Sequence, residues 1–248
     1  MKNYYGSLCT EMYEILHASA PEDELAFYLS YARKGERILE PLCGSGRFLV
    51  PFLERGFAIQ GIDLSKEMLG KLRQKAPEAR AAQADILAYE PEEQFDYIFI
   101  SSGSISLFTD KAVCKSILSK MRSILKEGGK FVFAAETMAD RCADSPEPQV
   151  TASVQTAAGE TLVLKTRYFY DAATQTQFSP GTYELYRDGE LLQTETMDFQ
   201  THLYRLGEME ELLAEAGFSE VKVYGSYDKK SAESDETEMF LYECTWRK

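Results

Sequence analysis

Three acidic residues stand where strands are predicted to end, and carboxylates in such positions can bind cations and hydroxyl groups. Glu40 follows the apolar pair Ile38-Leu39, Asp63 ends a run that starts at Phe57, and Asp85 ends the next predicted strand. The carboxyl ends of successive strands in a doubly wound sheet line one crevice, so the three side chains can face one ligand. Each alone could be a cap or turn residue, but together they predict a ligand site.

A glycine turn, Gly44-Ser45-Gly46, follows Glu40 and brings the backbone close to that site. A dinucleotide fold would carry a third glycine for helix packing, but Leu49 occupies this position. A carboxylate at Glu40 would also repel a pyrophosphate. The charge therefore favours a ligand with an ammonium and a sulfonium group, followed by ribose and adenine. An NAD-dependent dehydrogenase is the reading with least support.

Strands and helices alternate from Arg37 to Ala135. We expect strands that end at Glu40 and Asp85, and further strands at 57–63, 95–100 and 130–135. Helices are expected at 48–55, from Ser65 to Pro77, and along the repeat of Val113, Ile117, Met121 and Leu125. This alternation predicts an α/β fold with a doubly wound, mostly parallel sheet.

The pattern is different on both sides of this core. Residues 4–34 show helical spacing divided at Pro21, which predicts two helices packed over the start of the sheet. After a polar linker at 140–148, residues 150–204 predict an antiparallel insertion of three or four strands, with Asp188-Gly189 as a hairpin turn. A helix at 208–216 and two strands, near 220–224 and 239–246, would complete a seven-stranded sheet.

These patterns divide the chain into three regions. Residues 1–139 hold the N-terminal helices and the ligand-binding core. Residues 140–205 hold the antiparallel insertion, which we expect to act as a substrate lid. Residues 206–248 return to the core sheet and complete it.

The composition excludes several classes of function. The 248 residues include 27 Lys and Arg against 40 Asp and Glu, a net charge of −13, which argues against a nucleic-acid surface. Five scattered cysteines and two histidines predict neither a disulfide framework nor a metal site. The sequence shows no membrane-spanning run and no signal peptide, so we expect a cytoplasmic protein.

Residues 36–137 resemble the class I S-adenosylmethionine-dependent methyltransferases, with the motifs of their Rossmann-like, cofactor-binding core in the same order. The glycine-rich motif is Glu40 to Gly46, and the ribose-binding acid is Asp63. The adenine-side motif is Ala84-Asp85-Ile86, and Leu125 to Gly129 resembles the segment that leads into strand five. The sequence departs from the family pattern in two ways: Glu40 replaces the commoner Asp, and Pro41-Leu42 replaces the usual residue and the first glycine.

The resemblance implies S-adenosyl-L-methionine as cofactor and S-adenosyl-L-homocysteine as product. It assigns the methionine moiety to the glycine turn and the ribose to Asp63, and it places Leu64 and Met68 on the two faces of the adenine. Ser101 would lie near the methionine end. The predicted cofactor-binding residues are Glu40, Cys43, Gly44, Ser45, Gly46, Asp63, Leu64, Met68, Asp85, Ile86 and Ser101.

The acceptor side is less well defined, because methyl transfer needs a base only when the acceptor must lose a proton. His202 and Tyr13 are the candidate catalytic residues, although His202 could equally be a strand residue at the sheet rim. Tyr5, Tyr170 and Arg205 are candidate substrate contacts. Tyr170 could instead pack within the insertion, and Arg205 could pair with a surface acid.

These observations lead to a functional hypothesis with two alternatives. The first is in-line methyl transfer to an N, O or S atom of a small molecule, by a monomer or homodimer. One alternative is a module that binds the cofactor without catalysis, and the other is a methyltransferase for protein or RNA. The missing basic stripe makes RNA the weaker acceptor of the two.

Overall fold

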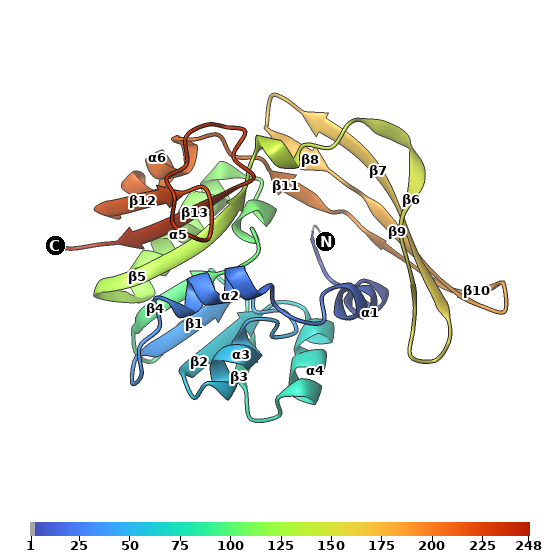
Figure 1. Cartoon of the computed structure of the whole chain (residues 1–248), viewed down its shortest axis with the longest axis horizontal. Helices are drawn as coiled ribbons and strands as arrows, with labels where there is room; N and C mark the ends of the chain where they lie inside the picture. Colours follow the sequence, from blue (N-terminus) through green and yellow to red (C-terminus); the bar gives the residue numbers. More distant parts are fainter. Residues whose placement is uncertain (1–2) are drawn as a thin grey trace.

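The computed structural model describes residues 3–248, which contain a central sheet packed between helices and a second, antiparallel sheet (Figure 1). The central sheet has seven strands in the order β12-β13-β5-β4-β1-β2-β3. Only β13 runs antiparallel to its neighbours, β12 and β5. The strands are β1 (Arg37–Pro41), β2 (Ala58–Asp63), β3 (Arg80–Gln83), β4 (Phe95–Ile100), β5 (Leu125–Glu136), β12 (Glu220–Tyr224) and β13 (Met239–Thr245).

Helices cover both faces of this sheet because its central strands are apolar on both sides. The helices are α2 (Glu22–Leu29), α3 (Leu49–Glu54), α4 (Lys66–Lys75), α5 (Lys111–Ile124) and α6 (Glu208–Glu215). Phe27 of α2 and Leu72 of α4 pack in one core cluster with Phe99, whereas Met121 of α5 and Leu213 of α6 pack in another. The predicted doubly wound class with an antiparallel insertion is confirmed.

The antiparallel sheet has six strands instead of the predicted three or four. They are β6 (Ser145–Gln155), β7 (Thr161–Asp171), β8 (Thr176–Phe178), β9 (Gly181–Arg187), β10 (Glu190–Met197) and β11 (Gln200–His202). The expected linker at 140–148 is partly wrong, because β6 already begins at Ser145 and pairs with Tyr168. The hairpin expected at Asp188-Gly189 joins β9 to β10. Two short 3₁₀ turns, η1 (Ile105–Leu107) and η2 (Met138–Asp140), complete the described elements.

The first helix, α1 (Ser7–Leu16), lies beside the second sheet and not over the start of the central one, which corrects the prediction (Figure 1). Leu8 and Met12 pack in one cluster with Tyr183 and Met197 of the insertion. The Glu195 carboxylate of β10 accepts hydrogen bonds from the first amides of α1, at 3.1 Å from Leu8 N and 3.0 Å from Cys9 N. The sequence gives no local cap for α1, so a distant strand supplies it.

The Glu195→Ala variant is expected to lower the free energy of unfolding by about 1–2 kcal/mol, because these amides at the end of α1 would lose their acceptor. Urea denaturation followed by circular dichroism measures the change. Glu190→Ala, an exposed acid on the same strand, is the matched control. Equal unfolding midpoints for Glu195→Ala and wild type would contradict the capping role.

Candidate functional site

A cavity of about 350 Å³ lies at the carboxyl ends of β1, β2 and β4. The glycine turn after β1 forms one wall, and the segment from Asp63 to Met68 forms the next. Ser101, Leu107 and Phe108 close the opposite side. The cavity therefore lies where strand order reverses, between β4 and β1, as ligand sites in doubly wound sheets do.

The glycine turn is fixed by packing as well as by its backbone conformation. Gly44 and Gly46 have φ angles of +53° and +82°, values that side-chain-bearing residues rarely adopt. A Cβ on Gly46 would lie 2.4 Å from Leu72 Cδ1, so this glycine lets α4 approach the turn. Leu42, where the family pattern has a glycine, also has a positive φ, of +59°. The turn thus keeps its shape without that glycine.

Glu40 lines the cavity and has one buried carboxylate oxygen without a hydrogen-bond partner in the described part of the chain. Its side chain is 1% exposed, and its Oε1 accepts a hydrogen bond from Ser101 Oγ at 3.2 Å. Its buried Oε2 has no partner among residues 3–248. Burial raises the pKa of Glu40 well above its usual value, and the nearby acids Glu24 and Asp63 add to this. A ligand ammonium group would satisfy this oxygen and stabilise the charged form.

Asp63 is held in a fixed orientation by the backbone. Its Oδ2 accepts from Gly44 N at 2.9 Å, and its Oδ1 accepts from Ser65 N at 2.8 Å. Burial raises the pKa of this carboxyl, while these amides favour its charged form. Each carboxylate oxygen keeps acceptor capacity for a further donor, such as a ligand hydroxyl.

The structure brings most of the predicted cofactor residues together. Those that line the cavity are Glu40, Cys43, Gly44, Asp63, Leu64, Met68 and Ser101. Ser45 and Gly46 belong to the same turn but stand behind its inner surface. The thiol of Cys43 has its pKa raised by burial and by Glu40, so it is a packing residue and no nucleophile.

Asp85 and Ile86 lie outside the cavity lining. The edge strand β3 ends at Gln83, two residues earlier than expected, so Asp85 falls in the following turn. There its Oδ1 accepts from Leu87 N at 2.8 Å, and Ile86 packs into the core.

The chain's first described residues also line this cavity, which the sequence did not predict. Asn3 Nδ2 donates to the carbonyls of Leu107 and Gln200, at 2.9 Å each. The Tyr4 hydroxyl donates to Glu67 Oε2 at 2.6 Å. These bonds fasten the N-terminal segment over the cavity, between the core and the insertion. Asn3 and Tyr4 belong to no recognised sequence motif, so no sequence pattern indicated this role.

A second cavity, of about 430 Å³, adjoins the first between α1, the inner face of the antiparallel sheet and the end of β5. Tyr5 and Tyr13 line both cavities. Their rings meet edge to face with 6.0 Å between centroids. Two ligands could therefore meet at these rings, one bound in each cavity.

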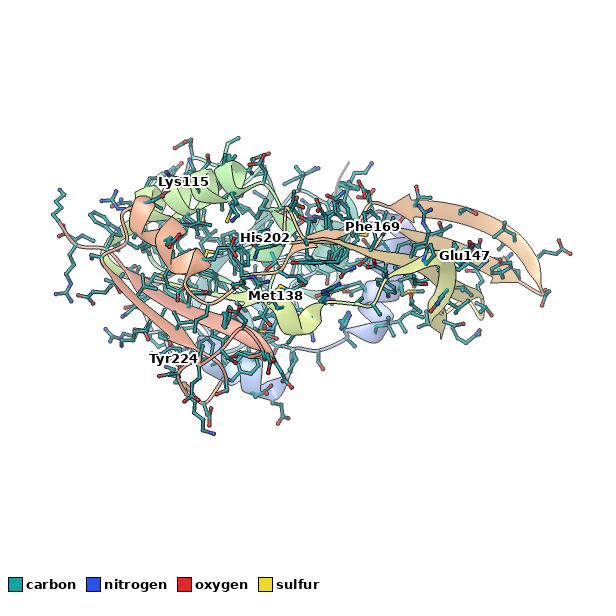
Figure 2. The ribbon with its side chains drawn as sticks, turned by 90° about the horizontal axis from the view of Figure 1, so that it is seen from above. Lys115, Met138, Glu147, Phe169, His202 and Tyr224 are labelled. Carbon is teal, nitrogen blue, oxygen red and sulfur yellow. The ribbon has the colours of Figure 1, made fainter. Side chains whose placement is uncertain are left out.

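The other predicted acceptor-side residues lie elsewhere. His202, labelled in Figure 2, is 1% exposed, with its Nε2 3.0 Å from Glu208 Oε1 and its ring against Tyr204. It is part of the lining of neither cavity. Arg205 forms an exposed ion pair with Asp235 at 2.9 Å. Tyr170 lies against Arg141, outside the lining, whereas Tyr168 on the same strand lines the second cavity. The two tyrosines are on the same face of β7, and the lining of the cavity ends at Tyr168.

Glu136, the last residue of β5, lines the second cavity and was not predicted. Burial and the neighbouring Asp140 raise its pKa to about 7. The sequence contained a pattern that indicates this position. Glu136 directly follows the buried run 131–135, just as Glu40 and Asp63 stand at the ends of their strands.

The described residues contain no cluster of three or more His, Cys, Asp or Glu arranged to hold a metal ion.

Comparison with known proteins identifies the core. Residues 38–129 match the family model described as a methyltransferase domain. A putative methyltransferase of Geobacillus sp. (strain WCH70) is 28% identical over 131 residues, 49% of this chain and 53% of the relative. The putative methyltransferase YqeM of Bacillus subtilis (strain 168) is 33% identical over 124 residues, 47% of this chain and 50% of the relative. The chain thus spans about half the length of the curated relatives it matches.

Solved structures resemble the chain over almost its whole length. An S-adenosylmethionine-dependent methyltransferase from Clostridium acetobutylicum superposes with a TM-score of 0.77 at 18% identity, covering 96% of this chain and 97% of that one. The sugar N-methyltransferase KedS8 from Streptoalloteichus has a TM-score of 0.75 at 18% identity, with coverages of 100% and 98%. The amino pentose methyltransferase CalS10 from Micromonospora echinaspora, solved with S-adenosylmethionine, has a TM-score of 0.68 at 18% identity, with coverages of 99% and 100%.

The sheet order, the glycine turn and these matches define the class I S-adenosylmethionine-dependent methyltransferase fold. Residues 38–129 match a methyltransferase domain, and the whole chain has the fold that these S-adenosylmethionine-dependent methyltransferases share. S-adenosylmethionine is the cofactor of this fold, and the unpaired Oε2 of Glu40 and the oriented carboxylate of Asp63 fit its ammonium and ribose groups. No helix in the described part of the chain has the length and apolar character required to cross a membrane.

The Asp63→Ala variant is expected to bind S-adenosylhomocysteine about 10- to 100-fold more weakly, because a hydrogen-bonding carboxylate would be removed from the ribose. Calorimetric titration measures the dissociation constant. The Asp85→Ala variant, which alters an exposed acid outside the lining, is the matched control and is expected to bind normally. Unchanged affinity of Asp63→Ala would refute the ribose contact, and weak binding by Asp85→Ala would restore its predicted adenine contact.

Proposed function

We propose that this protein transfers a methyl group to an N, O or S atom of a small molecule bound in the second cavity. The observation that carries the proposal is the pair of adjoining cavities that share Tyr5 and Tyr13. A donor in one cavity and an acceptor in the other would meet at these rings. Methyl transfer by in-line displacement depends chiefly on such positioning.

The residues of the first cavity would hold the donor in an extended arrangement. Glu40 binds the ammonium of the methionine moiety, and Asp63 binds the ribose hydroxyls. Leu64 and Met68 pack on the adenine. When bound, S-adenosylmethionine supplies an electrophilic methyl group on its sulfonium. The buried carboxylates Glu40 and Asp63 favour such a cationic ligand over a pyrophosphate.

The insertion, residues 140–205, would then serve as the wall and lid of the acceptor site. Leu164, Thr166 and Tyr168 of β7 point into the second cavity, as alternate residues of one strand face do. A volume of about 430 Å³ suits a molecule of drug or sugar size. The neighbours KedS8 and CalS10, which act on sugars according to their names, support a small-molecule acceptor.

Acceptor-dependent formation of S-adenosylhomocysteine from S-adenosylmethionine tests this function. The purified protein is incubated with a panel of small amines, alcohols and thiols, and S-adenosylhomocysteine is quantified by mass spectrometry. Turnover of at least one class is expected. Tight cofactor binding without methylation of any molecule in the panel would favour the alternative of a non-catalytic binding module. Methylation that is detected only when protein or RNA is supplied as acceptor would favour a macromolecular acceptor.

A further inference from the structure

We propose that Glu136 is a catalytic residue that binds the acceptor as an ammonium ion and removes one of its protons, so that the enzyme selects amines. This inference rests on the proposed methyl transfer and narrows it from N, O or S to nitrogen. Glu136, the residue proposed to contact the methyl acceptor, lies outside the motifs that bind the cofactor.

Glu136 lines the second cavity, and two hydrogen bonds fix its backbone there. Its backbone N–H donates to Ser106 Oγ at 2.9 Å, and its carbonyl accepts from Tyr204 N at 3.0 Å. A Cβ on Gly103 would lie 3.1 Å from Glu136 Cγ, so this glycine leaves room for the side chain. Tyr5, which lines both cavities, lies near Glu136, whose carboxylate adds to the effect of burial in raising the pKa of the phenol.

The groups that face Glu136 are acidic or neutral. Asp140 approaches from η2, Cys142 from the segment before β6, Thr201 from β11 and Tyr5 from the N-terminal segment. Asp140 opposes ionisation of Glu136, and Thr201 favours it. With burial, these contacts place the pKa near 7, in the range that suits a general base at neutral pH.

The charge of the second cavity favours a cationic acceptor. Its lining among residues 3–248 includes two carboxylates, Glu136 and Asp140, and neither lysine nor arginine. An ammonium ion would find two counter-charges there, whereas a carboxylate or phosphate ligand would find none. His17, just after the end of α1, is the cavity's basic side chain, and partial desolvation of its ring together with the charge of Arg47 lowers its pKa.

The tyrosines that line both cavities do not compete for this role. Burial raises the pKa of Tyr5 and of Tyr13, so both phenols stay protonated at neutral pH and accept no proton. They can donate hydrogen bonds and contact a cation through their rings. Glu136, rather than either tyrosine, therefore has a pKa suited to removing a proton from the acceptor at neutral pH.

The proton and electron balance of the step is simple. The Glu136 carboxylate takes one proton from the acceptor ammonium, which becomes a neutral amine with a free electron pair. That pair forms the new nitrogen–carbon bond as the carbon–sulfur bond breaks and its electrons go to sulfur. The product leaves as a methylammonium ion, and Glu136 releases its proton to solvent.

The test observes the Glu136 carboxyl directly. Protein labelled with ¹³C at the glutamate side-chain carboxyl is saturated with S-adenosylhomocysteine and titrated with acid and base by NMR, and the Glu136→Gln variant assigns the signal. We expect a midpoint near pH 7 that falls by at least about one unit when cyclohexylamine is added. Cyclohexanol, a neutral molecule of the same shape, is expected to leave the midpoint unchanged.

Kinetics provides a second readout with the same probes. The kcat/KM for cyclohexylamine is expected to rise with pH through about 7, because the carboxylate is the active form below the pKa of the amine. Glu136→Gln is expected to lower kcat about 100-fold or more with unchanged affinity for S-adenosylhomocysteine. Glu147→Gln, an exposed acid on β6, is the matched control with wild-type kinetics (Figure 2).

The outcomes separate this inference from the function on which it rests. Calorimetry that detects no S-adenosylhomocysteine binding would overturn both. Normal cofactor binding with a Glu136 signal that does not respond to the amine would overturn the inference alone. Wild-type turnover by Glu136→Gln, or preferred turnover of cyclohexanol or cyclohexanethiol, would also overturn it while leaving methyl transfer intact.

Discussion

The Gly61→Val variant is expected to lose about 3 kcal/mol or more of unfolding free energy and to bind S-adenosylhomocysteine poorly. A Cβ at this β2 position would lie 2.6 Å from both Cys43 Sγ and Leu49 Cδ1. Cys43 belongs to the glycine turn and Leu49 begins α3, so a larger residue would push the turn away from the sheet. Thermal denaturation and calorimetric titration measure the two effects.

A matched pair of variants isolates the steric cause. Gly70→Ala, in α4, adds a methyl group to open space and is expected to raise stability by up to about 1 kcal/mol. Adding Cys43→Ala to Gly61→Ala is expected to recover part of the stability lost by Gly61→Ala alone, because the clashing sulfur is removed. If Gly61→Val has the melting temperature of wild type and the same affinity for S-adenosylhomocysteine, the glycine turn does not depend on tight packing at Gly61.

The Glu40→Gln variant is expected to bind S-adenosylhomocysteine about 30- to 1,000-fold more weakly, a loss of about 2–4 kcal/mol. Glutamine has nearly the same size but no charge to pair with the ligand ammonium. The variant should fold at least as well as wild type, because the free protein no longer buries a titratable acid. Calorimetry gives the affinity, and urea denaturation checks the fold.

The pH dependence of binding follows from the same residue. Burial raises the pKa of Glu40, so the cofactor-free protein carries more of the protonated form than an exposed glutamate would. An ammonium ligand favours the carboxylate, so binding is expected to release a proton and to strengthen as pH rises. Asp85→Asn, at an exposed acid outside the cavity lining, is the control and is expected to keep the pH dependence of the wild type. Equal affinities of Glu40→Gln and wild type would contradict the ammonium contact.

The central sheet could be predicted because its signals are local. The apolar runs at 95–100 and 131–135 are long enough to specify buried strands, and their spacing leaves room for helices between them. The ends of β1 and β2 follow directly, which places Glu40 and Asp63 at the cavity. Asp85 was misplaced because β3 is an edge strand, where little burial marks the end.

The acceptor side could not be predicted because long-range contacts build it. Glu195 caps α1 from 187 residues away in the chain, and this contact holds α1 against the insertion. His202 resembled a base in sequence, but β11 points it at Glu208 in the interior. Glu136 gained its raised pKa from Asp140 and from burial under the second sheet, neither of which a strand pattern reveals.

A crystal structure of the complex with S-adenosylhomocysteine will show whether the first cavity holds the methyl donor next to the second. We expect the ligand amino group against Glu40, its ribose hydroxyls on Asp63, and its sulfur facing Tyr5 and Tyr13 at the opening to the second cavity. A ligand bound elsewhere, or one whose sulfur faces away from the second cavity, would contradict the proposal that the two cavities hold donor and acceptor.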